Sequence, residues 1–221
     1  MGIFRYDLYK SPNVGIFAKS NDKLVLLPHG YAETKLKKIT EILDTEPLFV
    51  SIAGNRIIGP MVVLNNNGMI LPSTASDDEL VYLKRITGLN VTKLDSKYTA
   101  VGNLISTNDK GAIVSPLFKN ELDKQIGDVL GVEAHTMSVA DFNQTGSIVV
   151  PTNNGAAVHP KASEEEVEII SSVLKVEVEP LTINGGIPYL SSGIVWNSKS
   201  LIVGSLTTGP ELIMLSRAFK M

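Results

Sequence analysis

The first notable absence in the sequence is cysteine, which occurs nowhere in its 221 residues. Disulfide bonds, zinc sites built on thiolates and catalysis by a thiol nucleophile are therefore excluded. The N-terminus MGIFRYDLYK also lacks the basic and then apolar segments of a secretory leader. Because a chain without cysteine suits a reducing compartment, we predict a cytoplasmic protein.

Long apolar runs and an excess of one charge are missing as well. The longest apolar run is residues 57–64, whereas a membrane-spanning helix needs about 20 apolar residues. Twenty basic and 23 acidic residues give a formal net charge of −3. No global positive field therefore indicates binding to nucleic acid or a membrane, and any contact with RNA has to be local.

What the sequence does contain is a repeat of about 44 residues. A proline recurs every 44 residues, at Pro28, Pro72, Pro116 and Pro160. The glycines that open the successive units are Gly15, Gly59, Gly102, Gly146 and Gly193. Five such units account for almost the whole chain, so we predict one domain over residues 1–221.

Each unit has the pattern strand, strand, helix, strand, and residues 100–116 contain the clearest hairpin. Asn-Gly turns at 67–68 and 154–155 and capping boxes at 76–79, 163–166 and 208–211 support this pattern. The predicted strands are 14–18, 24–27, 48–53, 90–94, 132–139, 176–181, 193–196 and 201–203, and three of the predicted helices are 31–43, 118–130 and 208–219.

The fifth unit stops after its helix, one strand short, and residues 3–8 form an extra strand before the first unit. A ring removes its free ends by joining them, as propellers do. We therefore predict an α/β fold, a closed five-fold pseudosymmetric propeller of ββαβ units. The N-terminal strand completes its fifth unit, the helices lie outside and the strands line the middle.

The segments SIAGNRIIGPMVV, AVGNLISTND and VHPKASEEEVEIISSVL resemble the translation initiation factor 6 family in its short archaeal form. This resemblance implies a pentein-type five-bladed propeller. It also implies a ribosome anti-association factor that binds the intersubunit face of the large ribosomal subunit and prevents joining with the small one. We expect a monomer with no membrane partner.

The resemblance further implies that one end of the ring contacts a ribosomal protein beside the sarcin–ricin loop. Carried over residue by residue, the ribosome-binding candidates are Gly15, Pro60, Asn103 and Ile148. The residues that follow the opening glycines are dissimilar, namely Ile16, Pro60, Asn103, Ser147 and Ile194. These positions can equally be turn and strand-start residues without a binding role. Ribosomal RNA is a second candidate partner, through Lys35, Lys37 and Lys38, although the residues favour a solvated helix face over this contact.

An enzymatic alternative comes from the same architecture, which resembles that of arginine deiminases and amidinotransferases. Those enzymes use a central cysteine, which this chain lacks, so the alternative is an inactive or unconventional guanidine-modifying protein. We predict no enzymatic activity and no cofactor. We also predict no metal site, because His29, His135 and His159 lack ligand spacing and are interpreted as loop and surface residues. Trp196 is predicted to pack in the core. The repeated glycines are interpreted as points where backbones crowd near the ring centre.

Overall fold

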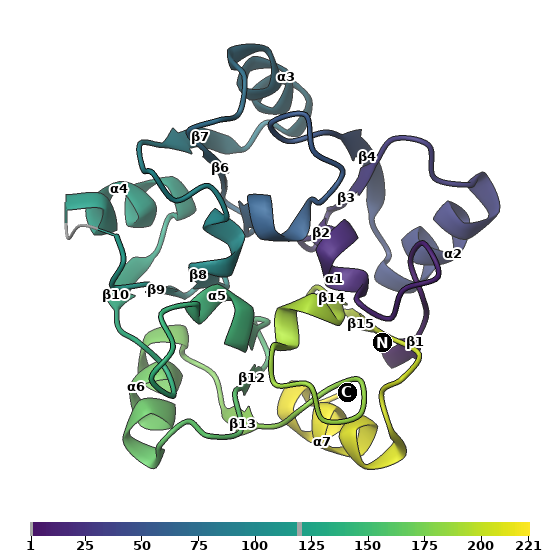
Figure 1. Ribbon diagram of the computed structural model, residues 1–221, viewed down its shortest axis with the longest axis vertical. Coiled ribbons are helices and arrows are strands. Elements are labelled where there is room, and N and C mark those ends of the chain that lie inside the picture. The colour runs from purple at the N-terminus through teal and green to yellow at the C-terminus, as the bar shows by residue number, and fades with distance from the viewer. Residues whose placement is uncertain (1, 119–120) are drawn as a thin grey trace.

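The computed structural model describes residues 2–118 and 121–221, in which five three-stranded sheets surround one axis (Figure 1). In each sheet the central strand pairs with an antiparallel and a parallel neighbour. The sheets are β2 (Lys19–Ser20), β3 (Leu24–Pro28) and β4 (Glu46–Val50); β5 (Val63–Leu64), β6 (Gly68–Pro72) and β7 (Asn90–Leu94); β8 (Ile105–Thr107), β9 (Gly111–Val114) and β10 (Glu133–Thr136); β11 (Val149–Pro151), β12 (Ala156–Val158) and β13 (Val178–Pro180); and β14 (Ile194–Trp196), β15 (Ser200–Val203) and β1 (Gly2–Arg5).

The long helices lie at the periphery and short helical turns lie close to the axis (Figure 1). The long helices are α2 (Glu33–Leu43), α3 (Asp77–Thr87), α4 (Glu121–Leu130), α6 (Glu164–Leu174) and α7 (Gly209–Phe219). The short turns are α1 (Val14–Phe17), η1 (Gly59–Met61), η2 (Val101–Asn103), α5 (Thr145–Ile148) and η3 (Leu190–Ser192). None of the helices within the described ranges is long and apolar enough to cross a membrane.

The predicted closure by the N-terminal strand is confirmed. Strand β1 pairs in parallel with β15, from Gly2 opposite Ser200 to Arg5 opposite Val203. The Tyr6 N–H extends this pairing by donating to the Val203 carbonyl at 2.8 Å. The fifth sheet is therefore built from both ends of the chain, and the two termini lie in the same unit (Figure 1).

The hydrophobic core joins neighbouring units rather than filling each unit separately. Leu26 and Val50 of the first unit pack in one cluster with Met69 and Leu83 of the second. In the same way Val195 of the fifth unit packs with Val25 and Leu43 of the first. Because each cluster spans a boundary between units, the apolar free energy that stabilises one unit is available only inside the ring.

The three predicted capping boxes are confirmed, and their glutamates also tie adjacent units together. Besides accepting from its N-cap, Glu79 accepts from the Ala53 N–H at 3.0 Å, and Glu166 accepts from the Ala140 N–H at 2.8 Å. The loop that leaves one unit is thus held by the first turn of the next helix. The same residue type therefore caps a helix and locks the ring.

Several predicted strands are wrong in position or length. Residues 14–17 form a helical turn rather than a strand, and the paired segment begins only at Lys19. The physical reason is crowding at the axis, where an extended chain would leave no room for the neighbouring units. The closing strands 132–139 and 176–181 are shorter than predicted, at Glu133–Thr136 and Val178–Pro180. Of the predicted helix 118–130, residues 119 and 120 lie outside the described residues.

Candidate functional site

The opening glycines form a contact ring around one end of the axis, which we call the glycine end. A Cβ atom on Gly59 would collide with the Gly15 carbonyl oxygen, one on Gly102 with the Gly59 oxygen, and one on Gly146 with the Gly102 oxygen. None of these glycines has a positive φ, so close approach of backbones is the reason for glycine here. The interpretation of these residues as points of backbone crowding is confirmed.

The fifth member of this ring is Ser191, which corrects the sequence alignment. A Cβ on Gly15 would collide with the Ser191 carbonyl oxygen, so Ser191 closes the circle of contacts. Gly193 lies two residues further on, at the end of η3, beside the Ile183 and Asn184 side chains. The residue equivalent to Ile16 and Asn103 is therefore Ser192, not Ile194, and Ile194 is fully buried.

Inside this ring lies a cavity with an accessible volume of about 180 Å³. The residues after the glycines line it, and three of the four ribosome-binding candidates, Gly15, Pro60 and Asn103, lie together there. The remaining lining residues are Ile16, Lys19, Gly59, Ser147, Tyr189, Ser191, Ser192 and Trp196. Residues from all five units therefore meet at one hollow, as the repeat predicts.

The fourth candidate, Ile148, lies in the core instead. Its side chain is 0% exposed and packs with Val149 and Val158. The preceding residue, Ser147, lines the cavity. The carried-over position is thus one residue too late, and Ile148 has no side-chain surface to offer a partner.

Two further residues line the cavity. The sequence interpretation did not identify Lys19 as a site residue, and it placed Trp196 in the core alone. Lys19 is only 8% exposed, and its Nζ lies 4.3 Å from the centroid of the Trp196 ring. Burial lowers the pKa of the Lys19 amine to about 8. Trp196 packs against the core as predicted but also lines the cavity. A signal for Lys19 existed, because the equivalent repeat positions hold small or apolar residues, namely Val63, Ser106, Val150 and Val195.

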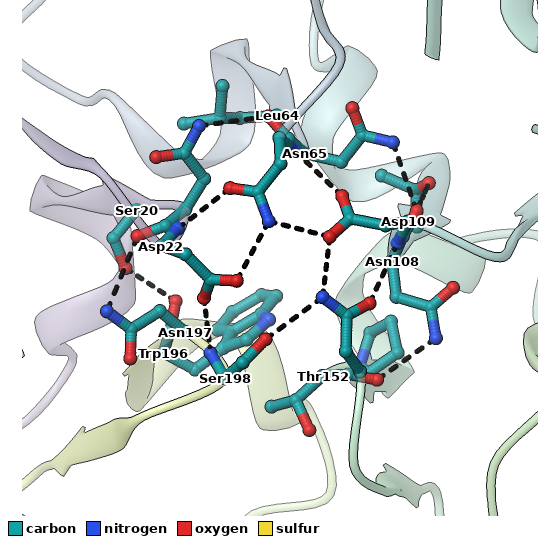
Figure 2. Close-up of a pocket in the computed structure, with 15 residues that line it drawn as sticks. Ser20, Asp22, Leu64, Asn65, Asn108, Asp109, Thr152, Trp196, Asn197 and Ser198 are labelled. Carbon is teal, nitrogen blue, oxygen red and sulfur yellow. Dashed lines mark hydrogen bonds between the residues drawn. The ribbon is translucent and has the colours of Figure 1, made fainter. Parts of the chain in front are cut away.

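The opposite end of the axis, the polar end, is closed by hydrogen bonds among side chains and the Ser198 backbone N–H (Figure 2). The Asn66 amide donates to Asp22 at 2.8 Å and to Asp109 at 2.6 Å. Asn153 donates to Asp109 and to Ser198, and the Ser198 N–H returns to Asp22 at 2.7 Å. One side chain from each unit thus joins a continuous ring. Trp196 lines the pocket at this end too.

A second layer of asparagines lies beside this ring. The Asn65 amide donates to the carbonyl oxygens of Asn108 at 3.0 Å and Leu130 at 2.8 Å, so it bridges to the next unit. Its Oδ1 accepts from two N–H groups of its own turn. The residues at this repeat position are Asn21, Asn65, Asn108, Thr152 and Asn197. The regular spacing of these residues is visible in the sequence. Their hydrogen bonds satisfy polar groups at the polar end within the protein itself.

The remaining sequence candidates lie away from the axis. Lys35, Lys37 and Lys38 are exposed on the peripheral helix α2, where Lys37 forms an i,i+4 ion pair with Glu41 at 3.8 Å. His29 and His135 are exposed as predicted, but His135 lies in strand β10 rather than in a loop. His159 is wrongly predicted, since it is 4% exposed, and its Nδ1 accepts from the Lys161 N–H at 3.1 Å. Burial, followed by the Lys161 charge, lowers the pKa of His159, against an opposing effect of Glu166.

Five sheets around one axis, closed by a strand from the N-terminus, define a five-bladed α/β propeller. The eIF-6 family profile matches residues 3–218, and the chain belongs to this family. It is 50% identical over 219 residues to translation initiation factor 6 of Nitrosopumilus maritimus and 47% identical over 219 residues to that of Cenarchaeum symbiosum, with 99% of each chain covered. The corresponding Pyrococcus horikoshii protein is 40% identical over 223 residues, covering 99% of this chain and 98% of its own.

Membership of this family supports a role as a translation initiation factor. Among solved structures, C. jejuni agmatine deiminase aligns with 88% of this chain and 72% of its own, with a TM-score of 0.45 and 15% identity.

Proposed function

We propose that the protein binds the large ribosomal subunit through the glycine end and thereby prevents association with the small subunit. The family resemblance motivates the partner, and the architecture of the ring supports the surface. The main support for the proposal is that the side chains at the two ends of the axis differ in whether they are free to bind a partner. At the polar end the side chains bond one another, whereas at the glycine end unlike side chains from five units border an open hollow.

Asn103 is the strongest contact candidate at the glycine end. It is partly exposed, and its side-chain amide makes no hydrogen bond with any other part of the chain that the structure describes. An amide with free donors and an acceptor can bind a partner without first breaking an internal bond. Pro60 occupies the equivalent place in the neighbouring unit and offers a rigid apolar surface.

Tyr189 adds an aromatic contact at the rim of the same hollow. Its side chain is 44% exposed, and its ring contacts Phe142 edge to face, with centroids 6.1 Å apart. An exposed aromatic residue next to a concave surface with polar and apolar parts is typical of interaction hot spots. Lys37 and Lys38, by contrast, lie on a peripheral helix. We propose that they make rim contacts to ribosomal RNA at most.

Asn103→Arg tests the surface. A bulky charge at a central contact costs about 2 kcal/mol, or roughly thirty-fold in affinity for the large subunit. The matched control is Asn90→Arg, because Asn90 is exposed at the turn end of β7 and its hydrogen bonds are long, at 3.4 Å. We expect light scattering to show that Asn103→Arg no longer blocks subunit association at concentrations where the parent and Asn90→Arg do.

Thermal melting of each variant establishes that the fold is intact, and sedimentation with purified subunits identifies which subunit is bound. If a folded Asn103→Arg protein inhibits association as well as the parent, the glycine end is not the contact surface. If inhibition is instead lost when Lys37 and Lys38 are replaced by alanine, the surface lies on α2. Loss that fades at high salt would fit rim contacts of these lysines.

A further inference from the structure

The axial cavity contains a buried cation without a partner. Lys19 is more than nine-tenths buried, and its Nζ forms no ion pair or hydrogen bond with any residue in the described ranges 2–118 and 121–221. Its position over the Trp196 ring, 4.3 Å from the centroid, provides a cation–π contact but no counterion. Burying a charge without a paired anion is costly, so an amine held in this position favours an anionic ligand.

The lining of the cavity is compatible with only one class of anion. Lys19 is the single charged side chain among the lining residues, and Tyr189 is the only other ionisable one. The hydroxyl groups of Ser147 and Ser191 supply hydrogen-bond donors, whereas the Ser192 hydroxyl already donates to the Tyr189 carbonyl at 2.7 Å. One positive charge without an arginine fork matches a monovalent anion, whereas a phosphate group is usually held by several donors and charges.

The rest of the lining is apolar and the space is limited. Trp196, Ile16 and Pro60 provide apolar surfaces around the amine. The cavity has an accessible volume of about 180 Å³. A single water needs about 15 Å³, so the cavity is large enough for a small organic molecule. Hydrogen bonds between side chains close the polar end of the axis, so the opening lies at the glycine end.

We propose that the axial cavity is a binding site for a small free monocarboxylate. Its carboxylate pairs with the Lys19 amine, and its short apolar body packs on Trp196. The neighbouring elements α1, β3, β14, η1 and η3 carry no ionisable residue, and Lys19 is the only charged side chain that lines the cavity. This proposal does not rest on the proposed binding to the ribosome.

The chain contains a direct reporter for this site, because Trp196 is its only tryptophan. Titration with butyrate should change the tryptophan fluorescence saturably, with a Kd of about 1 mM for so small a ligand. Butyramide, which has the same shape without the charge, and inorganic phosphate should each bind at least ten-fold more weakly. Sodium sulfate at equal ionic strength is the blank, because chloride is itself a monovalent anion and could occupy the site.

Lys19→Met removes the amine while keeping the length of the side chain, and should weaken butyrate binding at least ten-fold. Lys23→Met is the matched control, because Lys23 is exposed in the following turn, and should leave binding unchanged. If Lys19→Met does not fold, the pH dependence of butyrate binding to the wild-type protein still tests the proposal. Its butyrate affinity should fall as the pH rises from 6.5 to 9, since burial lowers the pKa of Lys19 to about 8.

The proposal is overturned by any of four results. These are no saturable signal up to 100-fold above the expected Kd of about 1 mM, equal binding of butyramide, equal or tighter binding of phosphate, or butyrate affinity in a folded Lys19→Met protein equal to that of the parent. Equal binding of butyramide would identify the site as a purely apolar cavity. Tighter binding of phosphate would identify a general anion site.

Discussion

The contact between Gly59 and Gly15 gives the sharpest test of how the ring is held together. A methyl group on Gly59 would lie 1.8 Å from the Gly15 carbonyl oxygen and 3.0 Å from its carbonyl carbon. No side chain can rotate away to make room, because both partners are backbone. In Gly59→Ala, the first and second units would therefore have to move apart by more than about 1 Å in a close-packed interior.

The closed ring makes this displacement expensive. In an open array, neighbouring units could shift along the chain. Here the fifth sheet contains β1 from the N-terminus, and the Ser20 hydroxyl of the first unit donates to the Trp196 carbonyl of β14. Overpacking a core in which side chains can adjust costs typically 1–3 kcal/mol. Since only backbone can move at this contact, we expect about 4 kcal/mol. That loss is a large part of the 5–15 kcal/mol that stabilises a typical domain.

Thermal and urea unfolding of Gly59→Ala measure this cost. For a protein of this size, about 4 kcal/mol corresponds to a decrease in Tm of roughly 10 °C. The matched control is Gly209→Ala at the first residue of α7, where a Cβ meets no atom within 4 Å and the φ is not positive. Because Pro210 follows, an alanine is disfavoured in the helical backbone at this position, which offsets the entropic gain, so this control should stay within about 1 kcal/mol of the parent.

If Gly59→Ala melts within about 2 °C of Gly209→Ala, the glycine contacts do not constrain the ring. The explanation of the repeated glycines by close approach would then be wrong. Failure of Gly59→Ala to express in folded form, with a well-folded Gly209→Ala, would agree with the reasoning.

Three further predictions concern closure and pH. Removing residues 1–9 leaves β15 with an unpaired edge and deletes Leu8, which is 1% exposed, so the free energy of unfolding should fall by about 5 kcal/mol in urea titrations. Burial raises the pKa of Glu211. Hydrogen bonds from the Thr208, Gly185 and Gly186 N–H groups and the Thr182 hydroxyl together outweigh this effect and lower the pKa to about 2. The unfolded chain therefore takes up the proton first, and acid titration from pH 4.5 towards 2 should remove about 3 kcal/mol that Glu211→Gln lacks at every pH. For Lys19 the pH dependence of stability has the opposite cause, because its pKa of about 8 in the folded protein lies below the value of 10.5 in the unfolded chain. Without a ligand, the free energy of unfolding should therefore rise by about 3 kcal/mol between pH 8 and 10.5. Lys19→Met should abolish that rise.

The sequence by itself determined the architecture of this protein, because the signals involved are local and repeated. The recurrence every 44 residues, the Asn-Gly turns and the capping boxes such as Ser76 with Glu79 depend on hydrogen bonds within a few residues. The closure by β1 followed from counting strands, since a unit that lacks its third strand has an unpaired edge. The bridging asparagines such as Asn65 repeat with the same spacing, so they were also within reach of the sequence.

Only the tertiary structure decided which side chains face the axis. In the short turns at the glycine end, a shift of one residue exchanges the cavity for the core, as Ser147 and Ile148 show. The crowding of five backbones bends residues 14–17 into a helical turn, although their apolar pattern predicts a strand. Lys19 is buried because the fifth unit places Trp196 against it, 177 residues away in the chain. Contacts between such distant segments leave no local pattern, and for that reason the composition of the cavity could not be predicted from the sequence.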